Sequence, residues 1–256
     1  MPDDGRILMA KEIAAKSMEV LDKNKEYIGV LLCEGTLTSI DVCLYQKIYS
    51  LLYVVPVGGC SDVKKLIPLI RKRIKPYLVF GMIDRDSASK IEVRNMKKQG
   101  IYCTKLPFIE NIISCPEVLK ILCEVCDKDY YESYKGIRKK LLYILSQKLR
   151  DALPINIPIA ENEPIISITI NIKRQNGLTV RKTVSEQNII YAYRDKAVAN
   201  ETADALSIIG RRRYYTFFMK CLEDSIIEGK ILKCVSSYLP EIELSMEENA
   251  LSKFLI

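Results

Sequence analysis

A short apolar run, Ile28-Gly-Val-Leu-Leu-Cys33, ends at Glu34-Gly35 and sets the pattern of the first half of the chain. Three similar runs follow it, at Leu51–Val57, Tyr77–Ile83 and Ile101–Lys105. Continuous apolar strands alternating with helices are typical of a parallel sheet covered on both faces. We therefore predict an α/β fold with a four-stranded parallel sheet. Apolar spacing and capping residues predict the accompanying helices over 10–22, 39–49, 62–73, 87–99 and 110–122.

The second half of the chain has a different pattern. A Lys- and Leu-rich helix is predicted over Tyr130–Leu153, and the remainder to Ile256 is predicted to be mainly helical. Between them, isoleucines alternate with polar residues from Ile166 to Ile172, before Asn176-Gly177. This pattern favours a β-hairpin with a type I′ turn. We predict a catalytic domain over 1–126 and a helical region over 127–256, with the hairpin near 165–183.

Composition narrows the possible chemistry. The chain has 256 residues, and none of them is histidine, which excludes Ser-His-Asp triads, Cys-His dyads and His-ligated metal sites. The nine cysteines lie mostly in apolar segments, which favours reduced core thiols over disulfides. No apolar run approaches the ~20 residues of a membrane span, and no secretory signal is apparent, so we expect a cytoplasmic protein. The net charge of +7 suits an anionic partner such as nucleic acid.

Acidic residues follow three of the four predicted strands. Glu34 follows the first strand, Asp84 and Asp86 follow the third, and Glu110 comes shortly after the fourth. The carboxyl ends of parallel strands meet at one edge of a sheet, so these carboxylates are expected to converge there. Carboxylate oxygens are ligands that Mg²⁺ prefers. The sequence therefore predicts that these four residues either bind Mg²⁺, which Mn²⁺ could replace, or include a carboxyl group with a raised pKa. Glu110 could equally be an acid at a helix start, favoured by the helix dipole.

These motifs resemble the Toprim domain, the catalytic module of topoisomerases, primases and OLD-family nucleases. The resemblance spans Tyr27 to Leu122 and rests on Glu34-Gly35, Gly58-Gly59 and Asp84-Arg-Asp86, in that order. Phe108-Ile-Glu110-Asn is similar to the small Toprim nucleases of phage-defence systems.

The resemblance implies a function for each matched residue. Glu34 would act as general acid/base or share the metal, and Asp84, Asp86 and Glu110 would bind it. Such proteins cleave nucleic-acid phosphodiesters, and the defence-type members act on tRNA as toxic effectors restrained by an ABC-type ATPase. The family often uses a catalytic lysine, which no residue here matches clearly. We assign that role to Lys105, near the predicted sheet edge.

Further basic residues are candidates for nucleic-acid contact. Arg211, Arg212 and Arg213 precede two tyrosines, a combination suited to phosphate contact and base stacking, or to a solvated helix start. Lys64 and Lys65 lie near the predicted sheet edge. A homodimer is compatible with the sequence, which does not fix the oligomeric state.

Two other functions remain open from the sequence. Asp84-Arg-Asp86-Ser is also similar to aspartate-nucleophile phosphatases, although that family places the motif after the first strand of its core. A Toprim scaffold could also serve as a non-catalytic binding module.

Overall fold

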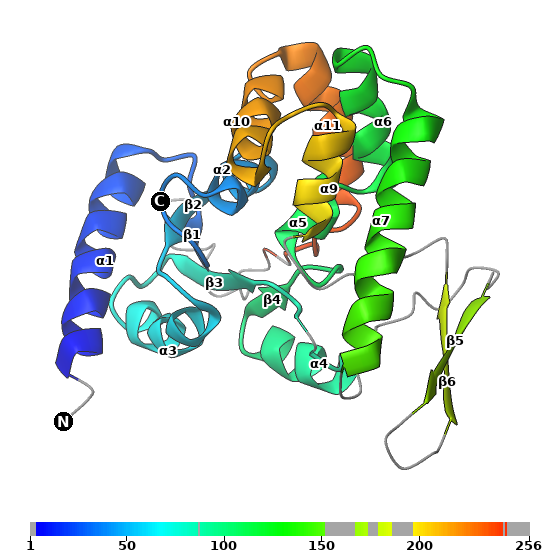
Figure 1. Ribbon diagram of the computed structural model, residues 1–256. Helices are drawn as coiled ribbons and strands as arrows, with labels where there is room; N and C mark the ends of the chain where they lie inside the picture. The colour runs from blue at the N-terminus through cyan, green and yellow to red at the C-terminus, as the bar shows by residue number, and fades with distance from the viewer. Residues whose placement is uncertain are drawn as a thin grey trace. The chain divides into compact units, whose positions relative to one another are not determined.

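A computed structural model describes residues 4–86, 88–151, 167–173, 179–185, 197–242 and 244 of the chain (Figure 1). The chain divides into two compact units. The first contains the described residues up to Asp84, residues 88–105, and the described residues from Leu239 onward. The second contains residues 85–87 and 106–238. Neither unit corresponds to one uninterrupted stretch of sequence.

The first unit is built on a four-stranded parallel sheet, as predicted. Its strands pair in the order β2-β1-β3-β4. Each is short and consists mainly of apolar residues, which suits a sheet covered on both faces. The strands span Gly29–Cys33 (β1), Leu52–Pro56 (β2), Leu78–Ile83 (β3) and Ile101–Cys103 (β4).

Helices cover both faces of this sheet, which confirms the predicted α/β class. Side chains of α1 (Asp4–Lys23) and α3 (Cys60–Arg71) share a core with Val30 and Leu32 of β1, and α4 (Lys90–Lys98) packs against that core. Helices α1 and α3 lie side by side in Figure 1. Leu31 and Cys33 point to the opposite face, because strand residues alternate. There α2 (Ile40–Ile48) buries Val42, Leu44 and Tyr45.

Gly81 in β3 sets how closely α3 approaches the sheet. A Cβ at this position would lie 2.5 Å from Ile67 Cδ1 and 2.8 Å from Val63 Cγ1. Both distances are far below a normal carbon–carbon contact, so a side chain would push α3 away. The absence of a side chain at Gly81 therefore allows the helix to lie directly on the central part of the sheet.

The second unit is helical and carries a hairpin. The predicted hairpin is confirmed as an antiparallel pair, with Ser167 opposite Ser185 and Lys173 opposite Thr179. The turn predicted at Asn176-Gly177 lies outside the described residues. The elements of this unit are α5 (Ile109–Ile113), α6 (Pro116–Val125), α7 (Tyr130–Asp151), β5 (Ser167–Lys173), β6 (Thr179–Ser185), α9 (Ala197–Ala205), α10 (Arg211–Cys221) and α11 (Ser225–Ser236).

The division into units differs from the boundary predicted near Cys126, which falls inside the second unit. Helix α5 packs against α9, and α6 packs against α7 and α11, so both belong with helices that come later in the chain. The chain then returns to the first unit, where the Tyr49 hydroxyl donates a hydrogen bond to the Pro240 carbonyl at 2.7 Å. Among the described helices, none is long and apolar enough to cross a membrane.

Candidate active site at the β1–β3 switch point

The order of the strands selects one edge of the sheet as the place for a site. From β1 the chain turns through α2 to β2 on one side, and from β3 it turns through α4 to β4 on the other. Such a reversal opens a crevice at the carboxyl ends of the two adjacent strands, where α/β proteins bind ligands. Glu34 follows β1 directly, and Asp84 follows β3 directly.

The structure brings these two predicted residues together. Glu34 Oε1 accepts a hydrogen bond from the backbone N–H of Asp84 at 3.0 Å, and both residues are partly buried. An N–H bond to a carboxylate is charge-assisted and therefore stronger than a neutral one. This bond fixes the Glu34 carboxylate beside the point where the Asp84 side chain leaves the backbone.

The turn after Glu34 depends on a glycine. Gly35 has φ +97°, and its N–H donates to the Gly58 carbonyl at 2.7 Å, which joins the ends of β1 and β2. A Cβ at Gly35 would lie 2.6 Å from Ser39 Oγ, the atom that accepts the Thr36 N–H at 2.8 Å. The local geometry therefore requires glycine at position 35, directly after the acid that the predicted chemistry requires.

A third carboxylate near this edge was missed in the sequence. Asp41 lies in the first turn of α2, and its Oδ2 would be 3.7 Å from a Cβ on Gly35. Burial, followed by the negative charges of Asp41 and Glu34, raises the pKa of the Cys33 thiol. Burial, followed by Asp41 and Asp84, likewise raises the pKa of the Tyr45 hydroxyl. The sequence did contain a signal for Asp41. It is an acid two residues after the N-cap position of the helix that follows Glu34-Gly35.

The donor chemistry at this edge suits a hard cation. Glu34, Asp84 and Asp41 offer carboxylate oxygens, and Mg²⁺ usually takes only one or two carboxylates while keeping several waters. Within the part of the chain that is described, no three Cys, Asp or Glu side chains form a ready-made metal-binding group. A carboxylate has about four lone-pair sites, so the hydrogen bond from Asp84 does not exhaust the capacity of Glu34.

The other two predicted metal ligands belong to the second unit. Asp86 is exposed, has φ +48°, and donates its N–H to the Pro107 carbonyl at 3.0 Å. Glu110 is only 9% exposed, and its Oε1 accepts the Tyr215 hydroxyl at 2.8 Å. Glu110 is therefore part of a buried contact between α5 and α10, which the sequence did not predict.

The predicted basic residues lie on several elements. In the first unit, Lys64 and Lys65 are exposed on α3, and Lys105 is exposed just after β4. In the second unit, Arg211 begins α10 and lies 6.0 Å from the centre of the Tyr215 ring. Arg212 and Arg213 are exposed in the same helical turn.

No protein-family model, no curated protein and no solved structure matches this chain. The function of the chain is therefore inferred from its fold and from the geometry at the ends of β1 and β3.

Proposed function

We propose that the chain is a Mg²⁺-dependent nuclease of the Toprim type. The observation that carries the proposal is the hydrogen bond from the Asp84 N–H to Glu34 Oε1, which joins the two acids at the β1–β3 switch point. Ligands bind at such a crevice in parallel α/β sheets. Two acids held together at this point are expected for a metal-assisted reaction. They are not expected if each acid simply belongs to an independent solvated loop.

The proposed mechanism assigns a task to each residue. Glu34, oriented by the Asp84 N–H, exchanges a proton with the attacking water or hydroxyl. Glu34 and Asp84 would share the cation at the ends of β1 and β3. The resemblance also implies Asp86 and Glu110 as ligands. Lys105 neutralises phosphate charge. When bound, Mg²⁺ or Mn²⁺ supplies charge neutralisation and a lowered pKa for its bound water, which suits a chain without histidine.

The wider biological role follows from the resemblance in Glu34-Gly35, Gly58-Gly59 and Asp84-Arg-Asp86. On that basis we propose that the substrate is RNA, with tRNA favoured, and that the protein is a cytoplasmic toxic effector of phage defence. An ABC-type ATPase would be its restraining partner. The positive net charge of +7 supports an anionic substrate.

Cleavage of tRNA in Mg²⁺ tests the proposal. We expect wild-type protein to cleave tRNA and EDTA to abolish cleavage. Glu34→Gln keeps an oxygen that can accept the Asp84 N–H but loses the charge, so cleavage should fall by about 10²-fold or more. Glu26→Gln is the matched control, because Glu26 is an exposed acid before the opposite end of β1.

Three results would contradict the proposal. Equal cleavage by wild type and Glu34→Gln would remove Glu34 from the mechanism. Binding of tRNA without cleavage of any RNA or DNA in Mg²⁺ or Mn²⁺ would favour a non-catalytic binding module. Hydrolysis of a small phosphomonoester with no nucleic-acid cleavage would favour the phosphatase that uses Asp84 as nucleophile.

A further inference from the structure

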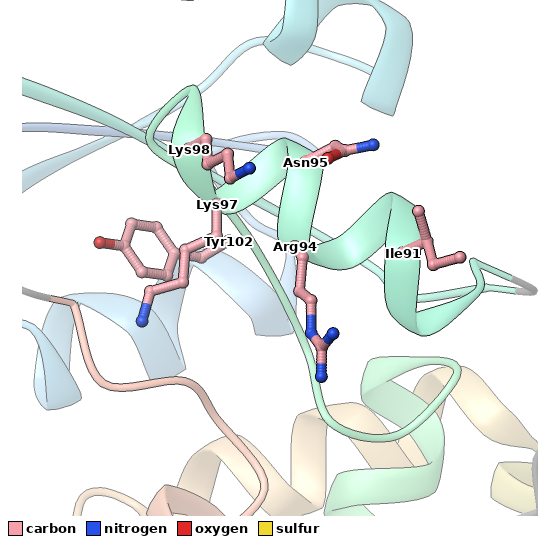
Figure 2. Close-up of a pocket in the computed structure, with 6 residues that line it drawn as sticks. All are labelled: Ile91, Arg94, Asn95, Lys97, Lys98 and Tyr102. Atoms are coloured by element: carbon pink, nitrogen blue, oxygen red, sulfur yellow. The ribbon is translucent and has the colours of Figure 1, made fainter.

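Two adjoining hollows lie along α4 and the edge strand β4, and the proposed mechanism leaves the first of them without a function. The first has a volume of about 460 Å³ and is drawn in Figure 2. The second has a volume of about 440 Å³, and the two share Lys97 and Tyr102. Both volumes fall within the ~300–1,000 Å³ typical of ligand sites. The first hollow is lined by Ile91, Arg94, Asn95, Lys97, Lys98 and Tyr102.

The way α4 packs gives the first hollow its positive charge. No side chain of α4 is fully buried, and only Val93 and Met96 pack against the core. Ile91, Arg94, Asn95 and Lys98 therefore share an outer face, at helical spacing of three and four residues. Three of the six lining side chains are cationic, and none of the six is acidic.

Stabilisation of α4 alone does not account for the cations and the exposed isoleucine in the first hollow. Lys97 and Lys98 lie in the last turn of α4, where cations favour the helix dipole. Arg94 lies before that turn, so the dipole does not explain it. The carbonyl of Gln99, just after the helix, already accepts a hydrogen bond from Arg71 at 3.1 Å. Ile91 is 69% exposed beside the cations, which a solvated helix face does not require.

The second hollow extends toward the proposed catalytic edge. It is lined by Lys105 and Cys103 as well as by Lys97, and among its described lining residues Glu241 is the one acid. Cys103 pairs with Ile83, the residue before Asp84. The cations from Lys98 to Lys105 therefore lead from the outer face of α4 to the carboxyl end of β4, beside the end of β3.

We propose that the two hollows form a binding track for single-stranded RNA. Arg94, Lys97 and Lys98 contact successive phosphates, and the exposed Ile91 packs against a base or ribose. Cations interleaved with apolar surface match the alternation of phosphate and base along a single strand. The inference rests on the proposed nuclease function, since it supplies the path by which the substrate strand reaches the Glu34–Asp84 edge.

Salt-dependent RNA binding tests the track. A fluorescein-labelled single-stranded RNA is titrated in EDTA, so that cleavage does not interfere, and anisotropy is measured between 50 and 200 mM salt. Each phosphate contact contributes roughly 0.7 to the slope of log K against log salt for a single strand, so Arg94→Gln/Lys98→Gln should lower the slope by about 1.4. Over this salt range wild type should then lose about sevenfold more affinity than the double variant.

The control is Lys11→Gln/Lys16→Gln, which removes the same charge from exposed positions of α1 in the same unit. We expect this control and the charge-preserving Arg94→Lys to keep the wild-type slope, with unchanged thermal melts for all variants. An unchanged slope in Arg94→Gln/Lys98→Gln, an equal loss in the α1 control, or no RNA binding by wild type would overturn the proposal. Polyglutamate that competes as well as RNA would overturn its assignment to nucleic acid.

The same protein preparations separate this inference from the proposed function. Glu34→Gln should bind RNA like wild type while losing cleavage. If Glu34→Gln cleaves normally but Arg94→Gln/Lys98→Gln loses binding, the nuclease mechanism fails and the track remains. If cleavage requires Glu34 but RNA binding does not depend on Arg94 and Lys98, the proposed binding track is wrong and the nuclease mechanism stands.

Discussion

Replacing Gly35 with alanine should damage the site loop specifically. Gly35 has φ +97°, a left-handed conformation that costs an L-residue roughly 1–2 kcal/mol. The added Cβ would also lie 2.6 Å from Ser39 Oγ and 2.9 Å from Ser39 Cβ. Rotating the hydroxyl away would relieve only the first of these contacts, so the Ser39 backbone must shift as well.

The second part of the loss in stability comes from the hydrogen bond that this backbone shift breaks. Ser39 Oγ accepts the Thr36 N–H at 2.8 Å, and a bond of this kind contributes about 0.5–1.5 kcal/mol. Together with the backbone strain, Gly35→Ala should lower the free energy of unfolding by about 2–3 kcal/mol. The Gly35 N–H also donates a hydrogen bond to the Gly58 carbonyl. A shift of this loop should therefore displace Glu34 and reduce cleavage of tRNA.

Urea unfolding followed by circular dichroism measures this loss, with Gly59→Ala as the matched control. Gly59 also follows a strand, but it has φ −105°, and a Cβ there would meet nothing within 4 Å. Alanine restricts the unfolded chain, which stabilises the protein by about 0.4–1 kcal/mol. Loss of a glycine at the N-cap position destabilises it, so the free energy of unfolding should be nearly unchanged. Equal free energies of unfolding for Gly35→Ala and Gly59→Ala would show that neither the positive φ of Gly35 nor its contact with Ser39 matters for stability.

Three further predictions concern single groups. Glu34→Gln should change the free energy of unfolding by no more than about 1 kcal/mol, because its amide oxygen can still accept the Asp84 N–H, and a larger loss in urea unfolding would indicate a structural role. Tyr215→Phe leaves the buried Glu110 carboxylate without its hydroxyl donor, so stability should fall by about 1–3 kcal/mol, whereas an unchanged melting temperature would contradict this contact. Burial raises the pKa of the Cys33 thiol, so this thiol should react with a disulfide reagent at pH 8 only after unfolding, as mass spectrometry of labelled peptides can check.

The sheet and the pairing of its two acids could be predicted from the sequence. Strands of a buried parallel sheet are local apolar runs, so Gly29–Cys33 and Leu78–Ile83 are recognisable without any tertiary information. The convergence of Glu34 and Asp84 then follows from the topology, because both residues come directly after strands. None of the nine cysteines, all of which lie in the described part of the chain, forms a disulfide, as predicted from their apolar surroundings.

Features that depend on distant contacts could not be predicted. The sequence indicates only that Glu110 is an acid at the start of a helix. Its hydrogen-bond partner, however, is Tyr215, 105 residues away. The boundary near Cys126 was placed from local composition, whereas α6 is covered by α11 from much later in the chain. The basic hollow along α4 combines helix residues with Tyr102 of β4, so its shape depends on how the helix lies on the sheet.

Anomalous diffraction from crystals of the wild-type protein soaked in Mn²⁺ would locate the cation shared by Glu34 and Asp84. We predict a peak at a coordination distance of about 2.0–2.6 Å from carboxylate oxygens of both Glu34 and Asp84. The same peak should be absent from crystals of Glu34→Gln. Crystals in which Mn²⁺ binds elsewhere, with no peak at the ends of β1 and β3, would rule out a cation site at Glu34 and Asp84.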